Sequence, residues 1–376
     1  MSRRIPQLET LRGLAALFVL LDHLPKILPL PDGILAIPVY VPAWWTGVDL
    51  FFALSGFVVV RGLVSDACAG GRLPAVASFA VRRAFRLWPA ALAVVAAVCA
   101  FAFAVDRHAD ASSGPLVLKE ARWALAGAAN LRGWLCTVHA ASDCARAEIL
   151  GHMWSLALEH QFYLLAPLVL IASARSAATA LLLVLACVVA LDRSGQGAWF
   201  FRPDALVLGS VLALVDFDRV RNRIVGIGRG RVFWTGLSAM LLAPVVVSSH
   251  SGSVGFLVVG LGAAAVVAAT ACAEPTTRAL PRALTALGAV SYSFYLWHLP
   301  VLNAWHEILA RAGALPSTQT GWMLAAAAAF PFCVAAAVLS HRLVEQPCRE
   351  LGGRLAERFA ARIRRHAGVV ALENGA

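Results

Sequence analysis

Two polar residues on the first apolar segment are the leading candidates for chemistry. Arg12 and His23 lie eleven positions apart, which on an α-helix returns to nearly the same face and spans roughly 16 Å of the axis. A guanidinium binds anions, and an imidazole is a base or a nucleophile near neutral pH. The pair predicts an anion site and a titratable group on one face. An interfacial anchor and a structural core histidine would explain the same spacing.

Three arginines form a second candidate group. Arg82, Arg83 and Arg86 precede an apolar segment that begins at Leu87. Arg83 and Arg86 are three positions apart, so they share a helical face, and guanidinium groups pair with phosphate through two hydrogen bonds. The spacing favours a phosphate-binding patch at the inner membrane surface. Simple anchoring by positive charge at the cytoplasmic side is the alternative.

A carboxylate within the apolar segment 153–173 is the third candidate. Ser155, Glu159 and Phe162 have the spacing i, i+4, i+7 and share one helical face. A buried carboxylate must be paired or protonated. We therefore expect Glu159 to orient a histidine on a neighbouring helix, and a purely structural tie to an arginine or histidine is the alternative.

A fourth group lies in the apolar segment 286–305. Ser291, Tyr295 and His298 share one helical face there. The pattern favours an aromatic-lined polar groove for a sugar or a pantetheine arm. Polar groups that only hold neighbouring helices together would give the same pattern.

Membrane-spanning helices must position these groups. Of the 376 residues, 60% are apolar and 14% charged, against roughly 45–50% and 25% in soluble domains. About 20 apolar residues in a helix cross the bilayer with every backbone group bonded internally. We predict an all-α, polytopic integral membrane protein with about ten transmembrane helices. The predicted spans are residues 13–29, 48–63, 87–105, 153–173, 177–191, 199–215, 232–247, 254–272, 286–305 and 322–339.

The basic residues predict the orientation of these spans. With the N- and C-termini both cytoplasmic, most of the 32 lysines and arginines fall on the cytoplasmic side, as the positive-inside rule requires. This topology explains the net charge of +11. We predict a transmembrane domain over residues 1–350 and a basic cytoplasmic tail over residues 351–376. The basic runs lack interleaved aromatic residues, so we expect no nucleic-acid partner.

The remaining motifs exclude several kinds of site. The eight cysteines are scattered without a C-x-x-C pair, so we expect no metal site. Cys136 and Cys144 fall on the predicted outer side, where a disulfide can persist, and a bridge between them is an open alternative. The sequence contains no Walker A loop, G-x-G-x-x-G, H-E-x-x-H or G-x-S-x-G motif, which removes support for nucleotide hydrolysis, metalloprotease and hydrolase-elbow chemistry.

Taken together, the motifs resemble the membrane-bound acyltransferase 3 family. The resemblance runs in order from about residue 6 to residue 349. Two positions depart from it: His160 stands where an acid or polar residue is common, and Gln346 where a basic residue is common. The matching segments are residues 8–23, 47–57, 82–86, 154–163, 291–298 and 344–347.

The resemblance implies an O-acyltransferase in a bacterial inner membrane. It would move an acyl group, usually acetyl, from cytoplasmic acyl-CoA to a hydroxyl of a cell-surface or periplasmic carbohydrate, with no permanently bound cofactor. The partners expected are the lipid bilayer, acyl-CoA and this acceptor. Its identity and the acyl chain length stay open.

On this hypothesis the site residues have distinct roles. Arg12, with Arg82, Arg83 and Arg86, holds the coenzyme A phosphates. His23 deprotonates the acceptor hydroxyl or briefly carries the acyl group, and Glu159 orients His23.

The other motif residues are expected to support the pocket. Tyr295, His298 or Ser155 would donate hydrogen bonds to the thioester oxyanion. A transporter or flippase for a glycolipid or a small solute is the alternative function, with Arg12, His23 and Glu159 then serving substrate or proton transport. The supporting residues are Asp49, Ser55, Trp154, Ser155, Tyr163, Ser291, Tyr292, Tyr295 and His298.

Overall fold

The computed structural model describes residues 6–28, 30–31, 43–106, 113–139, 148–171, 173–191, 193, 196–246, 252–273 and 282–373. Within these ranges the chain forms helices and no strand, as its apolar composition predicts. The α-helices are α1 (Pro6–Ile27), α2 (Gly47–Gly70), α3 (Arg72–Asp106), α4 (Ser113–Leu125), α5 (Ala129–His139), α6 (Met153–Leu165), α7 (Ala174–Ala190), α8 (Asp204–Leu214), α9 (Phe217–Ile227), α10 (Arg229–Val246), α11 (Gly252–Ala271), α12 (Arg282–Ala289), α13 (Ser291–Arg311), α14 (Gln319–Ser340) and α15 (Gln346–Glu373). Shorter segments are η1 (Trp44–Thr46), η3 (Glu148–Leu150), η4 (Ala166–Leu170), η5 (Gln196–Phe200) and the π-helical η7 (His341–Glu345).

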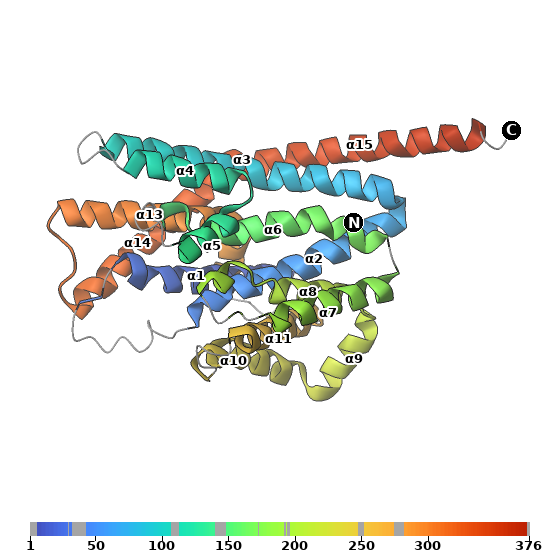
Figure 1. Ribbon diagram of the computed structural model, residues 1–376, viewed down its shortest axis with the longest axis horizontal. Helices are drawn as coiled ribbons and strands as arrows, with labels where there is room; N and C mark the ends of the chain where they lie inside the picture. Colours follow the sequence, from blue (N-terminus) through green and yellow to red (C-terminus); the bar gives the residue numbers. More distant parts are fainter. Residues whose placement is uncertain are drawn as a thin grey trace.

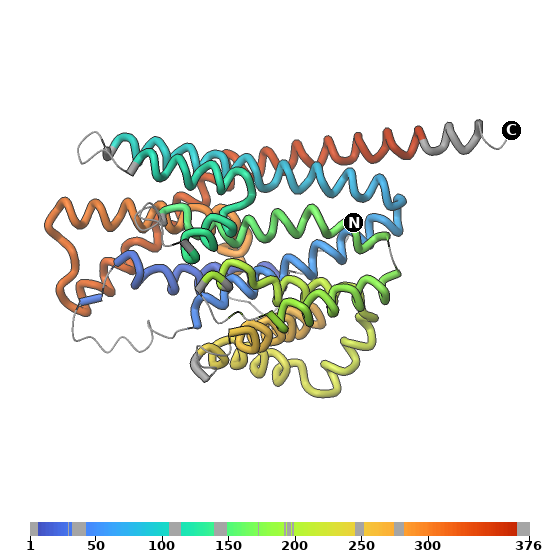
Figure 2. The backbone as a smooth tube through the Cα atoms, in the orientation of Figure 1, coloured from blue at the N-terminus to red at the C-terminus, as the bar shows by residue number. Residues whose placement is uncertain are grey.

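The longer helices form a bundle along one common direction (Figure 1). Helices α3 and α15 lie side by side along one edge of the bundle, and α15 extends past the start of α3 (Figure 2). Helices α9, α10 and α11 lie along the opposite edge. Between these edges, α1, α2, α6, α8 and α13 form the centre.

Helices overlap each of the predicted spans, although several are shorter than a bilayer requires. Among the described residues, four helical stretches are long and apolar enough to cross a membrane: Trp44–Gly70, Arg72–Ala104, Gly252–Ala271 and Gln319–His366. Helices Ala174–Ala190 and Asp204–Leu214 are apolar but shorter. The structure thus contains several candidate spans, and the number of about ten and the cytoplasmic side of both termini stay predictions.

Three predicted spans are interrupted: the span 286–305 is divided between α12, which ends at Ala289, and α13, which begins at Ser291. Proline accompanies the other two breaks. The span 153–173 changes from α6 to the 3-10 segment η4, which has Pro167 in its first turn. The span 199–215 is wrong at its start, because η5 ends at Phe200 and α8 begins only at Asp204, directly after Pro203. Proline lacks the backbone N–H that would continue a helix. Irregular backbone at membrane depth occurs where it is buried in protein, as at this second break.

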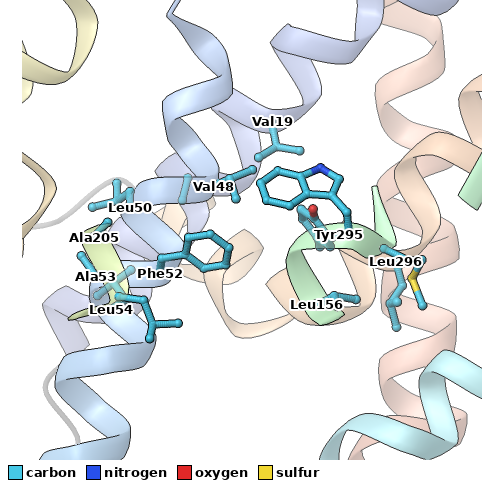
Figure 3. Packing of buried hydrophobic residues seen from close by; sticks show 14 of the residues in the cluster. Val19, Val48, Leu50, Phe52, Ala53, Leu54, Leu156, Ala205, Tyr295 and Leu296 are labelled. Carbon is cyan, nitrogen blue, oxygen red and sulfur yellow. The ribbon is translucent and has the colours of Figure 1, made fainter. Parts of the chain in front are cut away.

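The core lies where α1, α2, α6, α8 and α13 meet (Figure 3). Val19, Leu54, Leu156, Ala205 and Leu296 from these five helices are all buried there. In lipid, the hydrophobic effect gives little drive for helix association, so close van der Waals packing must stabilise such a core.

Glycines allow the closest helix crossings. A Cβ atom on Gly56 of α2 would lie 2.2 Å from the carbonyl oxygen of Leu206 in α8, and one on Gly288 of α12 would lie 1.7 Å from the carbonyl oxygen of Glu9 in α1. Both distances are far below van der Waals contact, so only glycine permits these approaches. The second crossing places α1, with Arg12 and His23, against the chain that leads into α13.

Candidate functional site

A cavity lies between α1, α2, α3, α6 and α13. Its apolar wall includes Val48, Phe51 and Phe52, and its charged residues are three arginines and one glutamate. We call it the arginine cavity. The structure brings together here, as predicted site residues, Arg12, Ser55, Arg83, Arg86, Ser155, Glu159, Tyr163, Ser291, Tyr292 and Tyr295.

The arginines of the cavity are held by their neighbours. Arg12 Nη1 lies 2.8 Å from Oε1 of Glu9, one turn earlier on α1. The Arg83 guanidinium lies 5.0 Å from the ring centroid of Tyr163 and 5.5 Å from that of Phe79, within the range of cation–π attraction. With Glu9 paired to Arg12 and Glu159 in the lining, three guanidinium groups against two carboxylates still leave a surplus of positive charge that suits an anionic ligand.

Glu159 accepts hydrogen bonds from the hydroxyls of Ser55 and Tyr163. It also interacts electrostatically with Arg12 and Arg83. This arrangement contradicts the expectation that Glu159 orients His23. Glu159 lies with Arg12 in the cavity, and His23 is roughly 16 Å further along α1.

Arg82 is not part of the arginine cavity. Its Nη2 lies 2.5 Å from Oδ2 of Asp66, and its side chain is 42% exposed. Consecutive residues on a helix point about 100° apart, so Arg82 and Arg83 cannot face the same cavity. The predicted trio of arginines on α3 is therefore divided, with Arg83 and Arg86 inside the cavity and Arg82 outside it.

Three histidines from separate elements meet beyond the cavity, and we call them the histidine cluster. His23 of α1 and His298 of α13 have ring centroids 5.0 Å apart, and His152, at the start of α6, lies 5.2 Å from His298. His298 is fully buried and His152 is nearly so, whereas His23 is partly exposed. The structure thus places His23 beside His298, another predicted residue, and outside the lining of the cavity.

Tyr295 links the cavity to the histidine cluster. It lines the cavity, and its ring contacts those of His152 at 5.4 Å and His298 at 5.5 Å. Its hydroxyl donates to the carbonyl of His152 at 2.9 Å, and Ser155 Oγ, 2.5 Å away, then donates to the Tyr295 oxygen. The hydroxyl hydrogen of Tyr295, expected to bind a thioester oxyanion, is therefore already used within the protein.

His152 is the residue of this cluster that the sequence did not single out. It stands two positions before Trp154, one residue before the predicted span 153–173. The signal that could have found it is its position one residue before a helix that carries Ser155 and Glu159 on one face. A histidine there enters the membrane with the helix.

Asp49 and Trp154 belong to a separate buried charge site. Asp49 Oδ2 lies 3.3 Å from Nη1 of Arg202, and neither side chain is more than 1% exposed. The Arg202 guanidinium lies 3.9 Å from the Trp199 ring centroid, 4.3 Å from that of Trp45 and 5.1 Å from that of Trp154. The sequence contained a signal for this site, because Arg202 is a charge inside a predicted span.

A second ion pair adjoins this site. Arg193 Nη1 lies 2.6 Å from Oδ2 of Asp204 and Nη2 lies 2.9 Å from Oδ1, a two-bond geometry. Asp204 is the first residue of α8, two positions after Arg202. These two ion pairs hold the irregular backbone around η5 against the bundle.

Residues of the segment 291–298 hold α13 in place. Tyr292 donates to the Leu87 carbonyl of α3 at 2.7 Å. Ser293 donates to Oε2 of the buried Glu345 in η7 at 2.8 Å. The predicted bridge between Cys136 and Cys144 stays a prediction, since Cys144 lies outside the described residues.

Comparison with known proteins identifies the family. An acyltransferase domain profile, that of the acyltransferase 3 family, matches residues 5–342. The chain is 24% identical over 335 residues to O-acetyltransferase OatA of Staphylococcus aureus, covering 80% of this chain and 51% of the relative. It is 24% identical over 379 residues to peptidoglycan O-acetyltransferase OatA of Listeria monocytogenes, covering 93% of this chain and 56% of the relative.

The chain spans about half the length of these curated relatives. No solved structure matches the chain significantly. The domain profile nevertheless covers nearly all of the sequence, including the arginine cavity and the histidine cluster. The chain therefore belongs to the acyltransferase 3 family.

Proposed function

We propose that this protein is a multi-pass O-acyltransferase of a bacterial inner membrane. It moves an acyl group, acetyl in the simplest case, from cytoplasmic acyl-CoA to a hydroxyl of a cell-surface or periplasmic carbohydrate. Family membership and relatives named as O-acetyltransferases support this proposal. The observation that carries it is the arginine cavity, which Tyr295 connects to the histidine cluster.

The cavity has the chemistry of a donor site for a coenzyme A thioester. Arg12, Arg83 and Arg86 provide fixed positive charge for phosphate groups. The wall formed by Phe51 and Phe52 offers apolar contact to the uncharged pantetheine arm. The arm would run from the arginines toward Tyr295, which brings the thioester close to the histidine cluster.

His23 supplies the base or the nucleophile on this proposal. As a base, it takes the proton of the acceptor hydroxyl while the oxygen attacks the thioester carbonyl. The C–O bond forms, the C–S bond breaks, and the coenzyme A thiolate receives the proton from His23. As a nucleophile, His23 forms an N–C bond to the acyl group while the C–S bond breaks and coenzyme A leaves as the thiolate. The acceptor oxygen then attacks the acyl carbon, the N–C bond breaks, and the hydroxyl proton passes to Nε2 of His23 and from there to the thiolate.

The transporter alternative is not favoured by the family match. A carrier needs no acyl thioester, so dependence on the donor separates the two functions. Peptidoglycan is the first acceptor to test, because the Listeria monocytogenes relative is named for it.

Radiolabelled acetyl-CoA supplied to inside-out and right-side-out vesicles tests the proposal. We expect wild-type protein to transfer label to envelope glycan only when donor is on the cytoplasmic face, and His23→Ala to transfer none. Arg83→Ala should need far more donor, while the matched control Arg231→Ala, an exposed arginine on α10, should behave as wild type. Absence of donor consumption in every vesicle type, with peptidoglycan and other glycans supplied, would contradict the proposal.

A further inference from the structure

Backbone carbonyls assign the hydrogen atoms of two rings in the histidine cluster. A carbonyl oxygen only accepts hydrogen bonds, so a ring nitrogen that bonds to one must carry hydrogen. His23 Nδ1 lies 2.8 Å from the Val19 carbonyl oxygen, and His298 Nδ1 lies 2.6 Å from that of Tyr295. A neutral imidazole carries one ring N–H, so Nε2 of each ring holds a lone pair.

The two rings then meet as donor and acceptor. His298 Nε2 lies 3.4 Å from His23 Nδ1, so the Nδ1–H of His23 has two acceptors, the Val19 carbonyl and the His298 lone pair. The opposite tautomer of His298 would place N–H against N–H. We infer that His298 is a positioning residue: its Nε2 is the second acceptor for the Nδ1–H of His23, which fixes the orientation of the His23 ring and leaves Nε2 of His23 free to react. The reactive part of this inference rests on the proposed function.

The surroundings hold His298 in one orientation. Its ring is fully buried and lies nearly parallel to Phe294, with an interplanar angle of 8° and centroids 6.3 Å apart. The ring of His152 approaches it edge-on. A ring packed on two sides and bonded to the Tyr295 carbonyl cannot rotate to exchange its nitrogens without leaving the core.

His152 itself is fixed by a carbonyl that a proline makes available. Its Nε2 lies 3.2 Å from the carbonyl oxygen of Leu296. In a regular helix that oxygen would accept from the residue four positions later, but this residue is Pro300, which has no N–H. The hydrogen bond that α13 lacks at Pro300 therefore leaves a carbonyl that fixes the His152 ring, at the start of α6, against His298.

The arrangement serves either route of acyl transfer. When Nε2 of His23 takes the hydroxyl proton, the ring becomes positively charged and its Nδ1–H keeps both acceptors. When Nε2 attacks the thioester carbonyl, an N–C bond forms, the C–S bond breaks and coenzyme A leaves as the thiolate, while the acylated, positively charged ring keeps the same Nδ1–H. Loss of the His298 acceptor removes a hydrogen bond to the charged His23 ring, so kcat should fall by roughly tenfold to a hundredfold.

Nitrogen-15 NMR of histidine-labelled protein in liposomes tests the tautomer without any activity assay. The signals of His23 are those absent from His23→Gln. We expect His23 with protonated Nδ1 and unprotonated Nε2 in wild type, and a shifted Nδ1 signal in His298→Phe, where the Nδ1–H keeps only the Val19 carbonyl as acceptor. An unprotonated Nδ1 on His23 in wild type, or an unchanged Nδ1 signal in His298→Phe, would overturn the inference.

Acetyl transfer kinetics test the consequence. His298→Phe should lower kcat with little change in the KM for acetyl-CoA, and His298→Gln, whose amide oxygen can accept from His23, should recover most of the loss. His306→Gln, at a partly buried position further along α13, is the matched control and should match wild type. A His298→Phe kcat within twofold of wild type, or no recovery in a folded His298→Gln, would overturn the inference.

The two claims fail differently. If wild type transfers acetyl groups but His298→Phe is equally active, the proposed function stands and the inference is wrong. If wild type never uses acetyl-CoA, the proposed function is wrong, and the NMR measurement still decides the tautomer.

Discussion

The arginine cavity and the histidine cluster are neighbours that hold polar groups inside the helical bundle in opposite ways. In the cavity, the guanidinium groups of Arg12, Arg83 and Arg86 face empty volume, where an anionic ligand can bind. In the histidine cluster, His298 and His152 are buried, and one ring nitrogen of each bonds to a main-chain carbonyl. Charges that face a cavity suit binding, whereas rings fixed by the backbone suit a reaction that needs one arrangement of hydrogens.

Removing the reactive ring should have the largest effect on turnover. We expect His23→Ala to lower kcat for acetyl transfer by about 10²–10⁴-fold, the usual contribution of a general base. Thermal unfolding should change little, because the partly exposed His23 ring makes few structural bonds. Single-turnover transfer from acetyl-CoA measures the effect, and a variant that keeps a tenth of wild-type activity would exclude His23 as base or nucleophile.

The buried Arg202 sharpens the comparison, because it is a fully buried charge outside the arginine cavity. We expect Arg202→Ala to lower the free energy of unfolding by about 3–5 kcal/mol, since Asp49 would be left as an uncompensated buried charge. The double variant Arg202→Met, Asp49→Leu should be considerably less destabilised. Unfolding in detergent measures both, and equal stability of Arg202→Ala and wild type would refute this structural role.

Removing an arginine side chain from the cavity should weaken donor binding more than it slows turnover. We expect Arg83→Ala to raise the KM for acetyl-CoA by roughly tenfold to a hundredfold, because a hydrogen bond to a charged group is lost, and to leave kcat nearly unchanged. Arg83→Lys should recover only part of the affinity, since an ammonium cannot form the paired hydrogen bonds. Steady-state kinetics with varied donor separate the two constants, and a selective fall in kcat would contradict the assignment.

Arg82 should show the smallest effect and marks the boundary of the cavity. Its ion pair with Asp66 is about 40% exposed, and such pairs contribute little. We expect Arg82→Ala to change the KM for acetyl-CoA by less than about threefold. A rise equal to that of Arg83→Ala would show that the donor also contacts the exposed side of α3.

The sequence predicted the parts that follow from helical periodicity. Ser155 and Glu159 share a face of α6 and line the cavity, as their spacing of four requires. Arg83 and Arg86 likewise line it together. Consecutive residues were harder to assign to one site, because Arg82 adjoins Arg83 in the chain but points about 100° away on a helix.

Contacts between helices could not be read from one sequence. Nothing in the spacing of His23 and Glu159 indicates that they lie at different depths, because depth depends on how α1 and α6 are offset. The bond between His152 and the Leu296 carbonyl depends on Pro300, which lies far from His152 in the chain. The helix break around Arg202 was not predicted, because the apolar residues on both sides dominate the mean hydropathy of the span 199–215.

Equilibrium binding of radiolabelled acetyl-CoA to liposomes that contain wild type, His23→Ala or Arg83→Ala tests whether donor binding and chemistry occupy separate regions. We predict that His23→Ala binds the donor as tightly as wild type and transfers nothing, while Arg83→Ala binds at least tenfold more weakly. Loss of donor binding in His23→Ala, together with normal binding in Arg83→Ala, would contradict the division between the arginine cavity and the histidine cluster.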